Sequence, residues 1–402
     1  MHTRRIGVWI VGAWGSVAST VILGALALRH NLTEPIGIIT ETDPFRRLDF
    51  VPFSAMEFGG CDVRQGSFVH TASQMVKEIG VLDPAVIHQL EPDLVVIERD
   101  IHPGITTNCG EAIHKLANVV HRGDASLREQ VAWIVNALET FKSSRNIEEV
   151  VVVNLASTEP PLAPHPSHED LSALEKSLDE NDIQPFRASS LYAYAAITSG
   201  CPYLNFTPSE AALFPSIVML AESNGVPVMG NDGKTGETLV KSALAPLFRC
   251  RNLEILSWEG VNILGNMDGR VLNHPDNRES KIRTKDRVLG QILGYSPHSH
   301  VRIDYVPSLG DQKTAWDFIH FRGFLGAKMS LQFVWQGYDS LLAAPLVLDL
   351  VRWADLAKRR GESGLLPHLA VYFKDPLGVT EHRLYEQFRM LEGYTLRATK
   401  EQ

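Results

Sequence analysis

An apolar strand, a glycine turn and an apolar helix follow one another near the start of the chain. This order limits the possible folds more than any other feature of the sequence. Residues 5–11 are short, apolar and β-branched, which predicts a buried strand. Residues 12–15 (Gly-Ala-Trp-Gly) predict a tight turn, and residues 16–29 predict a helix with one apolar side. A further apolar run at residues 36–40 predicts a second strand. Strand, helix and strand in this order open a βαβ unit, which predicts an α/β fold.

The glycine turn also indicates a dinucleotide site. Such a turn lets a pyrophosphate approach the backbone N–H groups at a helix N-terminus. Ala18 stands where the usual fingerprint has its third glycine, and a small residue can serve there. Glu41 follows the second predicted strand and is a candidate for the ribose hydroxyls, although its spacing exceeds the usual roughly 20 residues. A tight turn that binds no ligand is the alternative.

Charge and cysteine content exclude several classes of protein. The 402-residue chain has a net charge of -9, which argues against non-specific binding to nucleic acid. Residues 6–28 are mostly apolar, but glycine, serine and threonine interrupt them, so we expect neither a membrane span nor an export signal. The four cysteines form no CxxC pair, and we expect reduced thiols in a cytoplasmic protein. They are Cys61, Cys109, Cys201 and Cys250.

Further strands are expected at residues 94–97 and 150–153, and residues 170–198 are expected to be helical. The strand at 150–153 runs into a polar segment, residues 154–159. Ligands of open α/β sheets bind at the carboxyl ends of strands, so this segment is a candidate part of the site. His165 lies just beyond it with His168, but no third ligand has a fitting spacing, and we expect no metal.

The second half of the chain has a different pattern of predicted elements. A short strand at residues 226–230 leads into the polar loop 231–236 and a helix that extends to residue 248. Several strands then follow with fewer long helices between them, which predicts a second sheet, antiparallel or mixed. These strands are expected at residues 253–258, 301–306 and 330–335. Residues 341–360 predict a strong helix, and the C-terminus is again helical.

Four lysines of the second half stand in polar contexts: Lys281, Lys285, Lys313 and Lys374. Each of them alone would most simply be a solvated surface group. Together they suit an anionic substrate whose reaction develops negative charge on oxygen, because lysine binds phosphate and can donate or accept a proton.

In chain order, many segments resemble the myo-inositol-1-phosphate synthase family. Each segment alone is weak, but the ordered set is highly specific and covers most of the chain. The segments are GAWGSVAST, FGGCDV, NLASTE, YLNFTPSE, PVMGNDGKTGETLVKS, GVNILGNMDG, ESKIRTKD, VPSLGDQK, YDSLLAAPLVLDLV and YFKDPLG.

The resemblance implies an α/β fold of two parts. Residues 1–230 and 339–402 would form a Rossmann-like NAD-binding domain. Residues 231–338 would form an inserted α+β sheet domain that carries catalysis and tetramerisation. The expected cofactor is NAD, and the expected partners are a small sugar phosphate and three further copies of the chain.

The resemblance also implies a reaction. Glucose 6-phosphate would be oxidised at C5 by NAD, form an enolate and close onto its C1 aldehyde in an aldol step. Re-reduction of the ketone would give 1D-myo-inositol 3-phosphate with no net turnover of the cofactor. This chemistry needs an acid and base at one oxygen and a cation beside the enolate, which lysines can supply.

The resemblance implies three sets of site residues. The catalytic set is Asn262, Asp268, Lys281, Lys285, Lys313, Asp339 and Lys374. Lys281 and Lys374 are expected near the C5 oxygen and the enolate, Lys285 and Lys313 on phosphate or a proton relay. The cofactor set is Gly12, Ala13, Trp14, Gly15, Ser16, Val17, Glu41, Ala156, Ser157, Asp232 and Lys234. Asn205, Ser209 and Lys234 are expected at the substrate, with loop capping as the alternative for the first two.

Several positions depart from the family pattern, and they leave other substrates open. Pro160 stands where the family has an arginine, Asp304 where it has a lysine, and Ser209 ends a Phe-Thr-Pro-Ser segment that replaces Gly-Ser-Pro-Gln. A cyclase for another sugar phosphate would retain the lysines and change such positions. An ordinary NAD(P) dehydrogenase and a non-enzymatic NAD-binding protein are the remaining alternatives.

Overall fold

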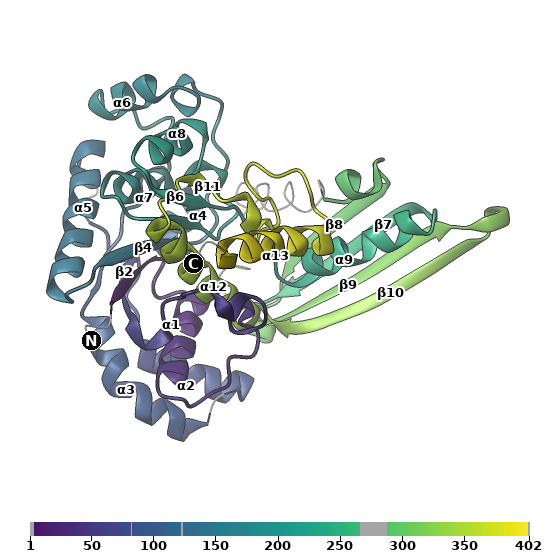
Figure 1. Cartoon of the computed structure of the whole chain (residues 1–402), viewed down its shortest axis with the longest axis horizontal. Coiled ribbons are helices and arrows are strands. Elements are labelled where there is room, and N and C mark those ends of the chain that lie inside the picture. The colour runs from purple at the N-terminus through teal and green to yellow at the C-terminus, as the bar shows by residue number, and fades with distance from the viewer. Residues whose placement is uncertain (1–3, 82, 122–123, 266–287, 401–402) are drawn as a thin grey trace.

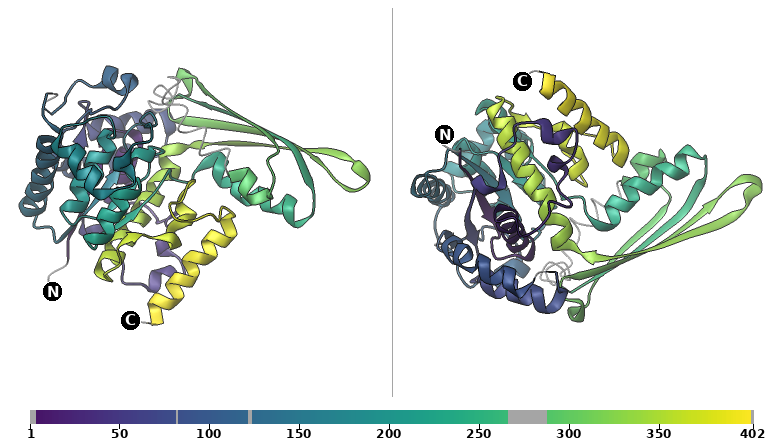
Figure 2. Two further views of the ribbon diagram at one scale, coloured as in Figure 1. Left: turned by 90° about the horizontal axis from the view of Figure 1, so that it is seen from above. Right: turned by 60° about the horizontal axis from the view of Figure 1, so that its bottom comes forward.

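The computed structural model describes residues 4–81, 83–121, 124–265 and 288–400. Two bodies are visible in Figure 1. Helices surround a parallel sheet at one end, and a long second sheet projects from it at the other. Figure 2 shows the same projection from two further directions.

The first sheet has a Rossmann strand order. Within the described residues seven strands pair in parallel, in the order β11-β6-β5-β4-β1-β2-β3. They are β1 (Ile6–Val11), β2 (Met56–Asp62), β3 (Ile101–Pro103), β4 (Glu149–Asn154), β5 (Tyr203–Asn205), β6 (Pro227–Met229) and β11 (Gly364–Leu365). The strand order reverses between β1 and β4, and the crevice at such a point is where open sheets bind ligands.

Alternation along β1 creates two hydrophobic cores. Ile6, Val8 and Ile10 join a core with α1 and α12, whereas Trp9 and Val11 join a core with α5 and α7 on the other face. The helices around this sheet are α1 (Ser16–Arg29), α2 (Phe68–Ile79), α3 (Pro84–Glu98), α4 (Glu111–Leu116), α5 (Leu127–Ser144), α6 (Leu171–Asp179), α7 (Ala188–Thr198), α8 (Pro215–Ser223), α12 (Asp339–Arg359) and α13 (Leu384–Lys400). Burial on both faces explains why β1 is apolar throughout.

The second sheet is mixed, as the sequence predicts. Its described strands have the order β10-β9-β7-β8, with β7 parallel to β8 and antiparallel to β9. They are β7 (Glu254–Leu264), β8 (His298–Tyr305), β9 (Gln312–Arg322) and β10 (Lys328–Tyr338). The helix α9 (Gly236–Cys250) and the helical residues 288–293 pack on one face, through Phe248, Trp258 and Ile292. Because β11 joins the first sheet, the chain returns to it after the second, as an inserted domain requires; the domain boundaries themselves stay a prediction.

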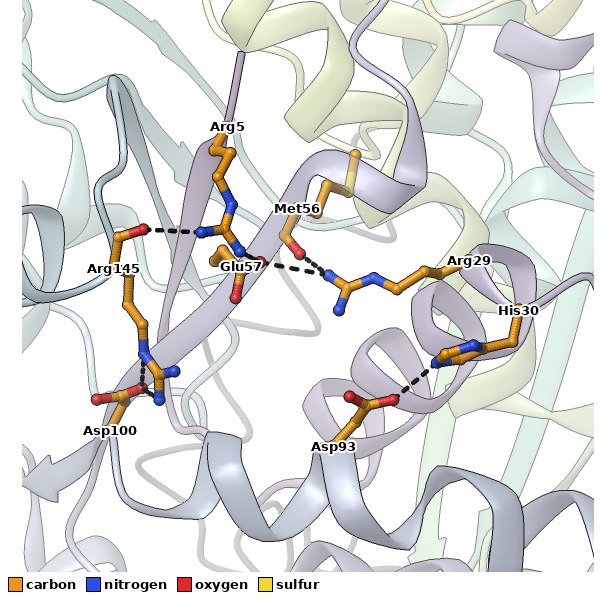
Figure 3. A network of polar contacts seen from close by, with 8 residues as sticks. All are labelled: Arg5, Arg29, His30, Met56, Glu57, Asp93, Asp100 and Arg145. Atoms are coloured by element: carbon orange, nitrogen blue, oxygen red, sulfur yellow. Dashed lines mark hydrogen bonds and ion pairs between the residues drawn. The ribbon is translucent and has the colours of Figure 1, made fainter. Parts of the chain in front are cut away.

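Polar contacts join the amino-terminal edge of the first sheet to three helices (Figure 3). Glu57 near the start of β2 pairs with Arg5 at 2.5 Å and with Arg29 at 3.8 Å. Arg145 after α5 binds the carboxylate of Asp100, and its carbonyl accepts from Arg5 at 3.2 Å. This edge lies opposite the carboxyl ends of the strands, so we assign the network to holding the sheet and its helices together.

The prediction of a strand at residues 36–40 is wrong. This segment ends in a short 3-10 helix, η1 (Ile39–Glu41), and the second strand of the sheet is β2. Asp349 of α12 is buried and accepts from the N–H groups of Ile39 and Thr40 at 2.8 and 2.9 Å. The buried Asp349 carboxylate therefore accepts the two N–H hydrogen bonds that a neighbouring strand would otherwise accept.

Two glycines weaken the strand pattern of β2, which is the true second strand of the sheet. Glycine is depleted in strands, and two of them occupy the middle of β2. A Cβ atom at Gly60 would lie 2.1 Å from the Ile10 carbonyl oxygen, so a side chain is excluded where β2 meets β1. The close approach of the two backbones thus requires the residue that weakens the strand pattern.

The strand predicted at residues 94–97 is also wrong, because this segment is part of α3. Ile87, Leu90, Leu94 and Ile97 are buried, whereas Val95 and Val96 are about 40% exposed. This spacing is helical, and the four-residue apolar run concealed it. The helix at 16–29, the strand at 150–153 and the three later strands are confirmed. The helical prediction for residues 170–198 is correct only in part, because residues 180–187 between α6 and α7 are not helical.

Replacing Asp349 by alanine is predicted to lower the free energy of unfolding by about 3 kcal/mol, because the buried Thr40 N–H and the partly buried Ile39 N–H would lose their acceptor. Urea unfolding followed by circular dichroism measures this. Asp49→Ala is the control, since the Asp49 side chain is 83% exposed and its ion pair with Arg359 should contribute little. Equal losses in both variants would contradict the role of Asp349.

Candidate active site

The predicted glycine turn is present at the carboxyl end of β1. Gly12 has a φ of +84°, and a Cβ atom there would lie 2.7 Å from the Cα atom of Ala156, so the turn packs against the segment after β4. In the described structure no side chain caps α1 at Gly15, and its first turn holds no acidic residue. The first N–H groups of α1 are therefore available to an anion.

Two cavities meet at this turn, and they share Gly15, Arg64 and the segment 155–157. The first, which we name the nucleotide cavity, lies over the carboxyl ends of β1, β2 and β4 and is bordered by Asp62, Glu159 and Tyr192. The second, the lysine cavity, extends toward the loop 232–235 and the start of α12. It contains Ser16, Val17, Asp232, Asp339 and Lys374, all of which the sequence predicts as site residues.

Backbone pairing carries Lys374 into the lysine cavity. The Lys374 N–H donates to the Asp232 carbonyl at 2.7 Å, and the Lys234 N–H donates to the Tyr372 carbonyl at 2.7 Å. The side chains of the same two segments then meet, with Lys374 Nζ 2.7 Å from Asp232 Oδ1. Both side chains are at most 9% exposed, so the charges are paired away from bulk water.

A second lysine–aspartate pair lies beside the first. Lys313 near the start of β9 is 2.9 Å from Asp339, the first residue of α12. A Cβ atom at Gly236 would lie 3.9 Å from both Lys313 Nζ and an Asp339 oxygen, so the pair adjoins the start of α9. The structure thus brings together Lys313, Asp339, Asp232 and Lys374 from four distant parts of the sequence.

Asn205 and Ser209 hold the loops around the site together through hydrogen bonds. The Asn205 amide donates to Asn231 Oδ1 at 2.7 Å and to the Ser209 carbonyl at 3.0 Å, and its side chain is fully buried. The Ser209 hydroxyl accepts from the Glu159 N–H at 3.0 Å. These bonds hold three loops at the carboxyl edge of the sheet, which is the loop-capping alternative; direct contact with substrate stays a prediction.

Lys234 faces away from the lysine cavity. Its ammonium donates to Gln387 of α13, and it borders an apolar cavity between α9, α12 and α13. Burial, and then the charge of Lys374, lower the pKa of Lys234 to about 7. An amine with this pKa is partly neutral near pH 7, in contrast to an ordinary lysine.

Other predicted residues lie apart from the two cavities. Glu41 pairs with Arg352 at 2.5 Å against α12, because the segment before it is not a strand. Asn262 lies on β7 and is buried between the second sheet and α9, where its amide donates to Glu237 at 2.5 Å. Asp268, Lys281 and Lys285 lie outside the described residues.

Two acidic residues were not singled out from the sequence. Asp62 ends β2, the position that Glu41 was expected to fill, and its carboxylate accepts from the Trp14 N–H at 2.9 Å. Glu159 accepts from the Ser189 N–H at 3.1 Å at the start of α7, and burial raises its pKa to about 7. An acid directly after a strand was the available signal for Asp62, but the glycines hid the strand.

Known proteins resemble this chain in sequence and fold. A family model of NAD-binding proteins, described as myo-inositol-1-phosphate synthase, matches residues 6–397. The chain belongs to this family. It is 34% identical to inositol-3-phosphate synthase 1 of Bacteroides thetaiotaomicron, over 97% of this chain and 94% of that protein.

Two solved structures agree with the fold over nearly the whole chain. The inositol-3-phosphate synthase of Caenorhabditis elegans has a TM-score of 0.86 at 25% identity, covering 99% of this chain and 86% of that one. A myo-inositol-1-phosphate synthase-related protein of Thermotoga maritima has a TM-score of 0.77 at 26% identity, covering 97% and 99%.

NAD is the cofactor of this family, and the residues present fit it. The uncapped first turn of α1 suits the pyrophosphate, and the two joined cavities adjoin this turn at the carboxyl edge of the sheet. Among the described residues no group of histidine, cysteine, aspartate or glutamate is arranged to hold a metal ion. In the same residues no helix is long and apolar enough to span a membrane.

The lowered pKa of Lys234 predicts a pH dependence of stability. The unfolded chain binds the lysine proton up to a pH near 10.5 and the folded chain only up to about 7, so the contribution of Lys234 to stability rises with pH between these values. From pH 6.5 to 9.5 the wild type should gain about 3 kcal/mol relative to Lys234→Met.

Urea unfolding of both proteins at the two pH values measures this difference. Lys176→Met is the control, because the Lys176 side chain in α6 is 72% exposed. A constant difference between wild type and Lys234→Met would show that the folded protein does not lower the pKa of Lys234.

Proposed function

We propose that this protein is an NAD-dependent cyclase that converts D-glucose 6-phosphate into 1D-myo-inositol 3-phosphate. The observation that carries the proposal is the Lys374–Asp232 pair, which borders the same cavity as the uncapped N-terminus of α1. A sugar phosphate in this cavity would lie beside both a cofactor on α1 and a lysine ammonium. The named relatives with the same fold support the same activity.

A bound NAD would supply hydride transfer at C5 of the sugar, first as the acceptor and later as the donor. The chain supplies the proton transfers. Lys374, as the neutral amine, accepts the proton of the C5 hydroxyl as the ketone forms, and the resulting ammonium returns it to the same oxygen at the end. Asp232 holds the ammonium in place through the 2.7 Å bond, so the amine does not need to be reoriented between the two steps.

Enolate formation places negative charge on the C5 oxygen, and a fixed ammonium beside it lowers the energy of that charge. Lys374 is assigned this role with Lys281. Lys313, oriented by Asp339 at 2.9 Å, is assigned to the phosphate or to a proton relay, together with Lys285. Exclusion of water from the partly buried pairs strengthens these electrostatic interactions.

A related cyclase that uses another sugar phosphate is the second candidate function. The observation that favours it is the segment 206–208, because Phe206, Thr207 and Pro208 line the lysine cavity at the position where the chain departs from the family pattern. An NAD(P) dehydrogenase would differ from both cyclases in producing net NADH.

Incubation of the purified protein with glucose 6-phosphate and catalytic NAD should give an inositol phosphate without net NADH. Phosphorus NMR with mass spectrometry measures the product, and absorbance at 340 nm measures NADH. Lys374→Gln should reduce turnover by at least about 100-fold, because the amide can still bind Asp232 but cannot transfer the proton. Lys176→Gln is the matched control and should retain activity, because the Lys176 side chain is 72% exposed and lies outside both cavities and the second sheet.

Each alternative has its own outcome. Product from a different sugar phosphate alone would replace the substrate and retain the reaction class. Stoichiometric NADH would establish a dehydrogenase. Wild-type turnover by Lys374→Gln would remove the lysine from the mechanism.

We also propose a cytoplasmic homotetramer assembled through the second sheet. The face of this sheet opposite α9 carries Trp316 and Val334, cross-strand neighbours that are 38% and 60% exposed. Phe324 and Leu325 at the tip of the projecting β9–β10 hairpin are 88% and 89% exposed. Exposed apolar side chains in such a group are typical of an interface between subunits. The four free cysteines fit a reducing compartment.

Val334→Arg is predicted to dissociate the tetramer, because a charge would be buried in the sheet interface without a partner. Light scattering coupled to size-exclusion chromatography measures the mass. Ile183→Arg is the control, since Ile183 is a 51% exposed apolar residue outside the second sheet. A tetramer that survives Val334→Arg would place the interface elsewhere.

A further inference from the structure

Arg64 occupies the junction of the two cavities. Among the described residues it is the basic residue that lines both of them, beside Gly15 of the glycine turn. The nucleotide cavity is otherwise bordered by two acids, Asp62 and Glu159. Lys374, the other described cation of the lysine cavity, is paired with Asp232.

One carboxylate holds both Arg64 and the glycine turn. Asp62 Oδ1 accepts from the Arg64 N–H at 2.9 Å and lies 3.5 Å from its Nε, while Asp62 Oδ2 accepts from the Trp14 N–H at 2.9 Å. Asp62 is 4% exposed, whereas the Arg64 side chain is 27% exposed. A guanidinium has five N–H donors, so a pair through Nε leaves donors for a second anion.

The adjoining helix offers backbone donors but no cation. A dinucleotide pyrophosphate carries two negative charges, and the first residues of α1 are Ser16, Val17 and Ala18. The chain as a whole has a net charge of -9, and Asp62 lies within a few ångströms of the turn. The guanidinium of Arg64 would add positive charge to the backbone donors at this helix N-terminus, and the fork of an arginine matches phosphate geometry.

We propose that Arg64 is the pyrophosphate-binding residue of the cofactor site and that Asp62 positions it against the glycine turn. The inference rests on the NAD site of the proposed function. It adds Arg64 as a residue that binds the cofactor and Asp62 as the residue that positions Arg64. Asp62 is engaged in holding the turn and Arg64, and Arg64 compensates its negative charge beside the cofactor.

Isothermal titration with ADP, adenosine and NAD tests this assignment. Relative to the wild type, Arg64→Gln should weaken ADP and NAD by about 10- to 100-fold and leave adenosine unchanged, because only the first two carry a pyrophosphate. Arg64→Lys should lie between the two. Arg47→Gln, which changes an exposed arginine paired with Asp43, is the matched control and should bind all three as the wild type does.

Kinetics add a second readout. In the cyclase assay, Arg64→Gln should raise the KM for NAD and change kcat little once NAD is saturating. A thermal melt of each variant shows whether folding is intact, and the ratio of ADP to adenosine affinity is independent of the fraction of folded protein.

Four outcomes would overturn the inference. An equal loss of adenosine affinity would place Arg64 at the adenosine end or in the fold. Tighter wild-type binding of 2′,5′-ADP than of ADP, lost in Arg64→Gln, would make Arg64 a 2′-phosphate ligand. Unchanged binding of ADP and NAD by Arg64→Gln would show that Arg64 does not bind the pyrophosphate. Absence of NAD and ADP binding by the wild type would overturn the cofactor site itself, which is a different failure.

Discussion

Backbone pairing between residues 231–234 and 372–375 is the contact on which the candidate site depends. Reciprocal N–H to carbonyl bonds, such as Lys374 to Asp232 and Lys234 to Tyr372, join segments separated by more than 100 residues. The loop is bonded on its other side to Phe206 and Thr207 after β5. Because backbone groups buried here must find partners, this pairing sets the position of Lys374 before any side chain contributes.

The same pairing gives two neighbouring lysines opposite surroundings. Lys374 meets the carboxylate of Asp232, which stabilises its charge, whereas Lys234 meets the neutral amide of Gln387 and has a pKa lowered to about 7. Lys313 has the charged partner Asp339. Burial of an ammonium is tolerated where a carboxylate comes with it and otherwise favours the neutral amine. Asp62 applies the same principle at the glycine turn, where it stands beside Arg64.

The accuracy of the sequence predictions followed the strength of the local pattern. The strand at 6–11, the glycine turn and the helix at 16–29 are fixed by apolar periodicity and glycine chemistry over adjacent residues, and they were predicted correctly. Residues 36–40 and 94–97 are short apolar runs that suit either a strand or another buried segment. At the first, Asp349 from a helix more than 300 residues away decided the outcome; at the second, the residues belong to a longer helix.

The amino-acid sequence by itself determined the fold class, the nucleotide turn and the family, because these depend on local periodicity and on an ordered set of motifs. Only the tertiary structure decided which of those motifs meet. It joined Lys374 to Asp232 and Lys313 to Asp339, and it placed Asn262 and Glu41 elsewhere. It also put Asp62 and Arg64 at the cofactor turn. Contacts between distant segments depend on how helices and sheets pack. The spacing of residues along the chain does not show which distant segments come into contact.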